Sequence, residues 1–110
     1  MTAVGLWVGQ NADHPLARAD RMFRMAAGER LDILNSGWMQ LESGHDPAPA
    51  RNDIRIVAHK IAGVAASLGH TRLGEIADEV EQLCTKDAAP KVLQRALREF
   101  MSLLAELTED

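Results

Sequence analysis

His59 is the residue of this chain whose type and placement are best suited to chemistry. It lies in a segment with helical periodicity, and the apolar residues of that segment fall on an arc between about 140° and 240° from it: Ile54, Val57, Ile61, Val64, Ala65 and Leu68. This arc indicates a buried stripe, so the histidine faces the opposite way, toward solvent. A neutral imidazole is a nucleophile near pH 7, and this position would present it to a partner.

The residues beside His59 on the exposed side of the helix are mostly small. Gly63 follows one turn later, where it costs roughly 1 kcal/mol of helix stability relative to alanine but leaves space beside the ring. A histidine without such surroundings would be an ordinary surface residue. We expect a shallow docking surface around the ring, formed by Ile56, Ala62, Ala66 and Ser67.

The elements that position this histidine are all predicted to be helices. The chain has 110 residues, of which 46% are hydrophobic and 25% charged, as expected for one globular domain. Helical periodicity covers residues 15–42, 51–68, 71–84 and the segment from Pro90 onward. No segment alternates with a period of two, and the connections are short. These features predict an all-α protein built as an antiparallel up-down four-helix bundle.

The boundaries follow from glycine and proline. Gly28 interrupts the first periodic segment, which indicates an additional short N-terminal helix over 15–27 before a longer one over 29–42, or one bent helix. Gly69 is predicted to end the helix that carries His59. The remaining boundaries are an N-terminal tail over 1–12, a single domain over 13–110 and a linker over 43–50. Asp13 or His14 is predicted to cap the first helix, with Pro15 in its first turn.

Composition and motifs exclude several classes of function. The net charge of -4 argues against binding nucleic acid, and no apolar run is long enough for a membrane span. Cys84 has no second cysteine to pair with, which favours a cytoplasmic location, and its place on an apolar stripe predicts burial. No zinc-ligand spacing and no glycine-rich phosphate loop is present, so neither a metal site nor ATP binding is expected.

The sequence around His59 resembles that of histidine-containing phosphotransfer (HPt) domains from bacterial phosphorelays. The resemblance lies in the run His59-Lys60-Ile61-Ala62-Gly63 and continues through Ala65, Leu68-Gly69, Leu73 and Glu81. It implies a helical-bundle protein that accepts a phosphoryl group on His59 and passes it to an aspartate. The small position of the family corresponds to Gly63, and Glu81 corresponds to a position that can hydrogen-bond the second ring nitrogen.

The chain departs from the family pattern at one position. A family lysine three residues after the histidine corresponds to Ala62, which cannot neutralise a phosphoryl group. Arg55, one turn before His59 on the same side, and Lys60, about 100° round the helix, are the candidate replacements. The resemblance implies that a receiver domain and a hybrid histidine kinase are the partners, that the receiver carries Mg²⁺, and that this chain binds no cofactor.

Two other functions stay open on the sequence alone. A helical module could bind a receiver or kinase domain without accepting phosphate, and a bundle with an exposed histidine could bind metal or haem. We expect a monomeric phosphocarrier without kinase activity of its own. Among the remaining residues, His70 is predicted to be a turn or cap residue, and the methionines of the first periodic segment are predicted to pack between helices: Met22, Met25 and Met39.

Overall fold

The computed structural model describes residues 15–109 as a bundle of four α-helices with no strand among them. The helices are α2 (Pro15–Ser43), α3 (Ala48–Ala65), α4 (Thr71–Thr85) and α5 (Pro90–Thr108), and a 3₁₀ turn, η1 (Ala66–Leu68), follows α3. The predicted tail and the predicted caps Asp13 and His14 lie outside the described residues. The prediction of an all-helical bundle is confirmed.

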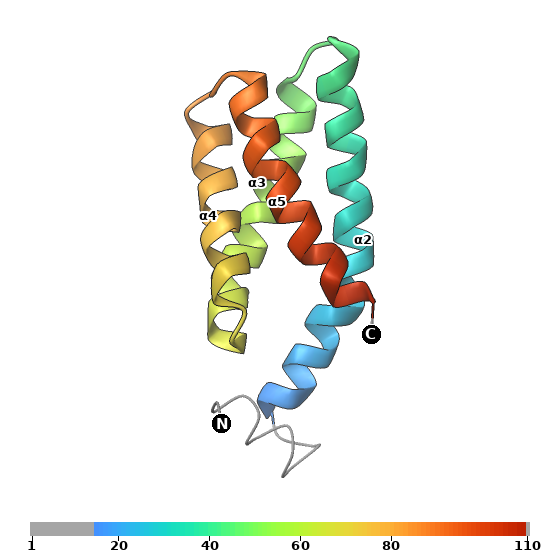
Figure 1. Cartoon of the computed structure of the whole chain (residues 1–110), viewed down its shortest axis with the longest axis vertical. Coiled ribbons are helices and arrows are strands. Elements are labelled where there is room, and N and C mark those ends of the chain that lie inside the picture. Colours follow the sequence, from blue (N-terminus) through green and yellow to red (C-terminus); the bar gives the residue numbers. More distant parts are fainter. Residues whose placement is uncertain (1–14, 110) are drawn as a thin grey trace.

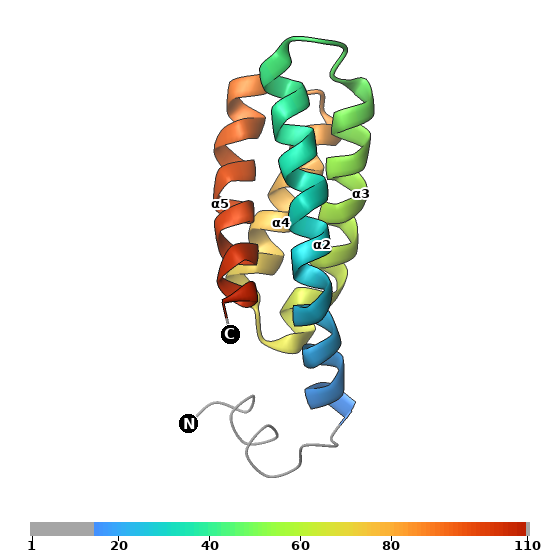
Figure 2. The ribbon, with the colours of Figure 1, turned by 90° about the vertical axis from the view of Figure 1, so that its right-hand side faces the viewer.

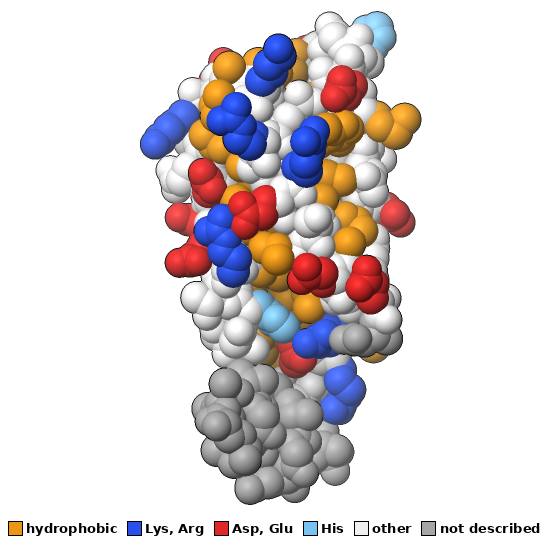
Figure 3. All heavy atoms as spheres, in the orientation of Figure 1, with side chains coloured by type: hydrophobic (Ala, Val, Ile, Leu, Met, Phe, Trp, Pro, Cys, Tyr) orange, Lys and Arg blue, Asp and Glu red, His pale blue; other side chains and the backbone are white. Residues whose placement is uncertain are grey.

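Successive helices run antiparallel, so the chain goes up and down the bundle (Figure 1). α3 packs between α2 and α4 and lies diagonally across from α5 (Figure 2). The face that α2, α4 and α5 form carries a mixture of basic, acidic and apolar side chains (Figure 3). Because α3 packs against α2 and α4 and not against α5, one long side of α3 is free of any helix, and that side carries His59.

The additional short N-terminal helix over 15–27 is not confirmed, because α2 continues without a break through Gly28, which agrees with the alternative of a single helix over this stretch. Phe23 and Ala27 before the glycine and Leu34 after it are all buried against the other helices. Burying a large apolar side chain contributes roughly 1.5–3 kcal/mol, which outweighs the roughly 1 kcal/mol that one glycine costs a helix. The first turns of α2 extend beyond the end of the α3–α4 pair (Figure 1, Figure 2).

The helix that carries His59 begins earlier than the sequence pattern indicated. α3 starts at Ala48 rather than at residue 51, because Pro49 stands in its first turn, where the missing N–H is not needed. The Asp46 carboxylate accepts a hydrogen bond from the Ala48 N–H at 3.1 Å. At the other end, Gly69 adopts the left-handed conformation with φ +90°, as predicted, and lets the chain turn into α4.

The core is aliphatic, with Phe100 as its largest fully buried side chain. Gly37 allows α2 to approach α3 closely, since a Cβ at that position would lie 2.9 Å from Cδ1 of Ile54. Three kinds of burial prediction were wrong. Val64, at the edge of the predicted stripe, is exposed; Cys84 is only partly buried; and Met22, Met25 and Met39 all lie on the surface.

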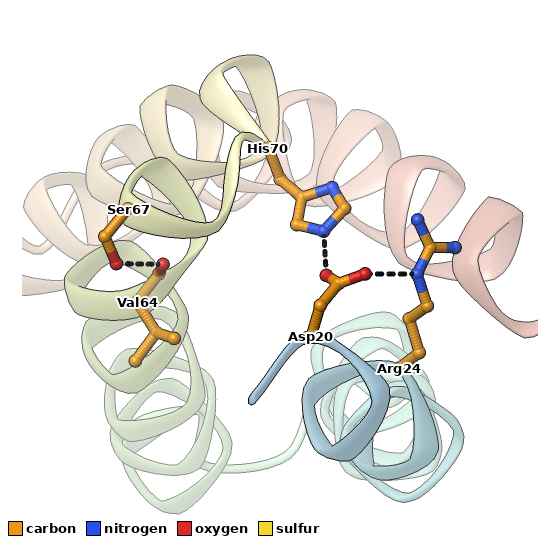
Figure 4. A network of polar contacts seen from close by, with 5 residues as sticks. All are labelled: Asp20, Arg24, Val64, Ser67 and His70. Carbon is orange, nitrogen blue, oxygen red and sulfur yellow. Dashed lines mark hydrogen bonds and ion pairs between the residues drawn. The ribbon is translucent and has the colours of Figure 1, made fainter. Parts of the chain in front are cut away.

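A polar clasp attaches the N-terminal half of α2 to the turn between α3 and α4 (Figure 4). His70 stands at the start of α4, as predicted for a cap residue, but its side chain makes no cap hydrogen bond. Instead its Nε2 lies 2.7 Å from Oδ1 of Asp20, and its ring stacks on Phe23 with centroids 5.4 Å apart. Arg24 donates to the other carboxylate oxygen at 3.0 Å. The clasp therefore anchors α2 beside the turn that ends the His59 helix.

Loss of the clasp carboxylate should destabilise the bundle in a pH-dependent way. Burial raises the pKa of Asp20, but hydrogen bonds from His70 and Arg24 outweigh it and hold that pKa below its usual value. A lowered carboxyl pKa stabilises the fold above the unfolded-state pKa, about 3.9, and this contribution disappears as pH falls through the lower folded-state pKa. We expect Asp20→Asn to lower the free energy of unfolding by about 1–2 kcal/mol at pH 7.

Urea unfolding at pH 7 and at pH 3 checks this expectation, with Asp32→Asn, an exposed carboxylate on the same helix, as the control. The difference between Asp20→Asn and the parent protein should shrink at the lower pH. An equal difference at both pH values would show that the Asp20 charge does not contribute.

Candidate functional site

His59 projects from the free side of α3, with 70% of its side chain exposed. Its Nδ1 lies 2.7 Å from Oε2 of Glu81, which reaches across from α4. The two residues are 22 positions apart in the sequence and meet because α3 and α4 pack side by side in antiparallel directions. The structure thus brings together two of the residues that the sequence singled out.

This contact determines what the imidazole can do chemically. A carboxylate accepts hydrogen bonds, so the Glu81 oxygen favours the tautomer whose proton is on Nδ1. Nε2 then carries the lone pair and faces solvent on an exposed ring. Any positive charge that develops on the ring after Nε2 bonds to an electrophile would lie next to the carboxylate. The pair therefore has the arrangement of an oriented nucleophile.

The two candidate cations flank His59 on opposite sides of α3. Lys60 is exposed and lines a groove between α2 and α3, whereas Arg55 is half-buried and lines the groove between α3 and α4. The Arg55 guanidinium donates to Oδ1 of Asn52 at 3.0 Å, which leaves further donors on its five N–H groups. Arg55 thus lies on the side toward which the ring of His59 reaches, and Lys60 lies on the other side.

The small residues near His59 leave open space. A Cβ built at Gly63 would meet nothing within 4 Å. Ala66, Ser67 and Ile56 are exposed, and Ala62 is partly buried. The Ser67 hydroxyl, in η1, donates to the Val64 carbonyl of α3 at 2.8 Å (Figure 4), so it is already engaged. The surface around the ring is therefore low and largely apolar.

A groove of about 260 Å³ continues this surface onto α2. Its lining includes Ile56 and Lys60 from α3 and Ala26, Glu29 and Ile33 from α2. Met22 precedes Ala26 by one turn and Met25 precedes Glu29 by one turn, so both exposed methionines extend the same face of α2. The sequence pattern predicted that these methionines pack between helices; a flexible, polarizable side chain suits an adaptable contact surface equally well.

Two functional features were missed in the sequence. Arg51 is buried at the start of α3 with its guanidinium against the α4–α5 loop, and Asp20 pairs with His70 across 50 positions. Neither has a local sequence signal, because each depends on a contact between distant segments.

Over residues 15–109, no group of three or more His, Cys, Asp or Glu side chains is placed to hold a metal ion. No helix in that range has the length and apolar character to cross a membrane.

These features define a class: a four-helix bundle that presents a carboxylate-bound histidine on an exposed helix face. A model of the Hpt domain family matches residues 20–110, so the chain belongs to the Hpt domain family. Hpt domains take part in phosphotransfer in two-component systems and interact with receiver and kinase domains. Searches of curated proteins and of solved structures returned no match. The resemblance inferred around His59 is confirmed at the level of the family.

Proposed function

We propose that this protein carries a phosphoryl group on Nε2 of His59 and relays it between receiver-domain aspartates in a phosphorelay. The observation that supports the proposal most directly is the exposed imidazole whose Nδ1 lies 2.7 Å from the Glu81 carboxylate. The free nitrogen is the one that faces solvent, and the surrounding small residues permit a close approach.

The transfer step follows from the tautomer. The Nε2 lone pair attacks the phosphorus of an aspartyl phosphate, the N–P bond forms, and the P–O bond to the aspartate breaks to release its carboxylate. The imidazole becomes positively charged, and Glu81 stabilises that charge through the proton on Nδ1. The reverse sequence delivers the phosphoryl group to the next aspartate. Positioning and charge stabilisation therefore account for the contribution of this chain.

The same proposal defines partners and location. A receiver domain supplies the aspartate and the Mg²⁺, a hybrid histidine kinase feeds the relay, and the phosphocarrier binds no cofactor and acts as a monomer without kinase activity. We propose that the partner docks over His59 on the face formed by Ile56, Ala62, Ala66 and Ser67, and that its contact extends to Ile33 on α2. We further propose a cytoplasmic location, where a single cysteine stays reduced.

Transfer from labelled phospho-receivers tests the function. Each receiver domain of the source organism is phosphorylated and mixed with the protein, and the label is followed by gel electrophoresis. Rapid gain of acid-labile, base-stable phosphate from one or a few receivers supports the relay. Binding to a receiver without any gain of label would instead support the alternative of an interaction module.

Gly63 gives a prediction about access to the ring. Gly63→Leu should slow phosphotransfer at least tenfold, because the new side chain occupies the space that a receiver must enter beside His59. The bundle should remain intact, since a Cβ at this position meets nothing within 4 Å. Gly63→Ala should raise helix stability by up to about 1 kcal/mol with a smaller effect on rate. Transfer at the parent rate in Gly63→Leu, with unchanged circular dichroism, would eliminate the clearance argument.

The cation that replaces the family lysine is tested by removing Arg55 and Lys60. We expect Arg55→Ala to reduce the transfer rate several-fold and Lys60→Ala less, because Arg55 lies on the side toward Glu81 and Lys60 on the other. Both effects should weaken at high salt, where exposed charges are screened. If the double variant transfers at the parent rate in low salt, the charge comes from the partner alone.

A further inference from the structure

A second cationic feature lies along the groove between α3 and α4, toward the end of the bundle where α3 begins. It is a pocket of about 480 Å³ between the first turns of α3 and the end of α4. Its lining includes Ala48, Arg51, Asn52 and Arg55 from α3, and Thr85 and Asp87 from the end of α4 and the loop after it. Neither the sequence pattern nor the proposed relay requires such a pocket.

Arg51 is the unusual residue of this pocket. Only 10% of its side chain is exposed, and its Nη2 donates to the Ala88 carbonyl. Its Nε and Nη1 are buried without a hydrogen-bond partner. The nearest carboxylate oxygen, Oδ1 of Asp87, lies 3.8 Å from Nε, beyond hydrogen-bond distance. A buried guanidinium is costly unless its donors are satisfied, and Arg51, which lines the pocket, has two donors without an acceptor.

The surroundings of Arg51 favour negative charge. Arg55 brings a second guanidinium one turn further along α3, and the first turn of α3 contains no acidic residue. The N-terminal end of a helix carries a partial positive charge, and at α3 the Asp46 carboxylate meets part of it through the Ala48 N–H. Asp87 is the one acid among the lining residues, and 89% of its side chain is exposed, so solvent screens its charge. Burial raises the pKa of the Cys84 thiol, which lines the same pocket and therefore stays neutral.

We propose that this pocket binds a small oxyanion of the size and geometry of inorganic phosphate, held between Arg51 and Arg55. An oxyanion offers several acceptor oxygens at once, which matches the fork of donors on a guanidinium. The oxyanion takes the place near Nε of Arg51 that Oδ1 of Asp87 now holds at 3.8 Å.

Because the pocket lies close to His59, an oxyanion bound in it should affect phosphotransfer. Arg55 lies one turn from His59 and is the cation that we propose for the phosphohistidine. An oxyanion in the pocket engages Arg55 and thereby slows phosphotransfer. This consequence depends on the proposed function, but the binding itself does not, since it is measured on the protein alone.

An NMR titration with sodium phosphate tests the site. Amide signals of ¹⁵N-labelled protein are followed at constant pH, and a parallel titration with sodium chloride at matched ionic strength serves as the reference. We expect saturable shifts in the millimolar range that concentrate in residues 48–55 and 84–88 and that chloride does not reproduce. Shifts that fail to saturate, or that chloride reproduces, overturn the proposal.

Variants locate the binding within the pocket. Arg55→Gln should weaken phosphate binding at least tenfold while leaving the fold intact, because this residue is not part of the core. Arg95→Gln, which removes the same charge from an exposed position on α5, should leave the affinity unchanged. Arg51→Lys keeps a charge in the pocket but removes the fork, so it should also weaken binding, provided circular dichroism shows a folded bundle. Parent affinity in Arg55→Gln overturns the assignment even if Arg51→Lys fails to fold.

Discussion

His59→Gln is expected to abolish phosphoryl acceptance while leaving the bundle folded. The side chain is 70% exposed and contributes no core packing, so its loss should change the free energy of unfolding by no more than about 0.5 kcal/mol. Glutamine has a similar reach but no nucleophilic ring nitrogen, so no N–P bond can form. Incubation with a labelled phospho-receiver, followed by acid and base treatment, measures the result.

The matched control is His45→Gln, which removes an exposed histidine from the loop between α2 and α3 and should transfer at the parent rate. Acid-labile phosphate on the His59→Gln variant would show that the assignment is wrong. His70 would then be the next candidate, although its Nε2 is already bound to Asp20.

Removal of Glu81 is expected to produce the second-largest effect. Glu81→Ala should slow phosphotransfer by about tenfold to a hundredfold, the range found when a residue that orients a functional histidine is lost. The carboxylate selects the tautomer and stabilises the charge on the phosphorylated ring, so its loss affects both the nucleophile and the product. Glu81→Gln keeps an acceptor oxygen without the charge and should give an intermediate rate.

A spectroscopic measurement separates this positioning role from a structural one. In Glu81→Ala, the ¹⁵N chemical shifts of the His59 ring should move toward the tautomer with its proton on Nε2, while circular dichroism stays unchanged. Glu79→Ala removes an exposed carboxylate from the same helix and should change neither the rate nor the ring shifts. An unchanged transfer rate in Glu81→Ala would mean that the receiver alone orients the ring.

The helical architecture could be predicted from the sequence because it follows from local periodicity. Apolar residues that recur every three or four positions must face a common core, and this placed His59 on the opposite side of α3 without knowledge of any neighbour. Gly69 marked the end of that helix for an equally local reason, since a left-handed conformation favours glycine. The family pattern then associated Glu81 with the ring.

The errors concern positions where local preference and tertiary packing disagree. Gly28 has a poor helix propensity, yet the buried residues on both sides of it keep α2 continuous. Pro49 resembles a linker residue but is tolerated in the first turn of α3. The methionines of α2 are apolar and were predicted to pack between helices, but they lie on the surface. Periodicity shows which residues share a face of a helix, and not which face another helix covers.

The sequence by itself therefore determined the helices, the exposed face of α3 and the identity of the candidate acceptor, since these depend on residues within a few turns of one another. Only the tertiary structure decided which groups meet across helices: the 2.7 Å contact between His59 and Glu81, the clasp between Asp20 and His70, and the buried guanidinium of Arg51. Each of these contacts joins segments more than 20 positions apart, and their distances are set by how the helices pack rather than by any local spacing.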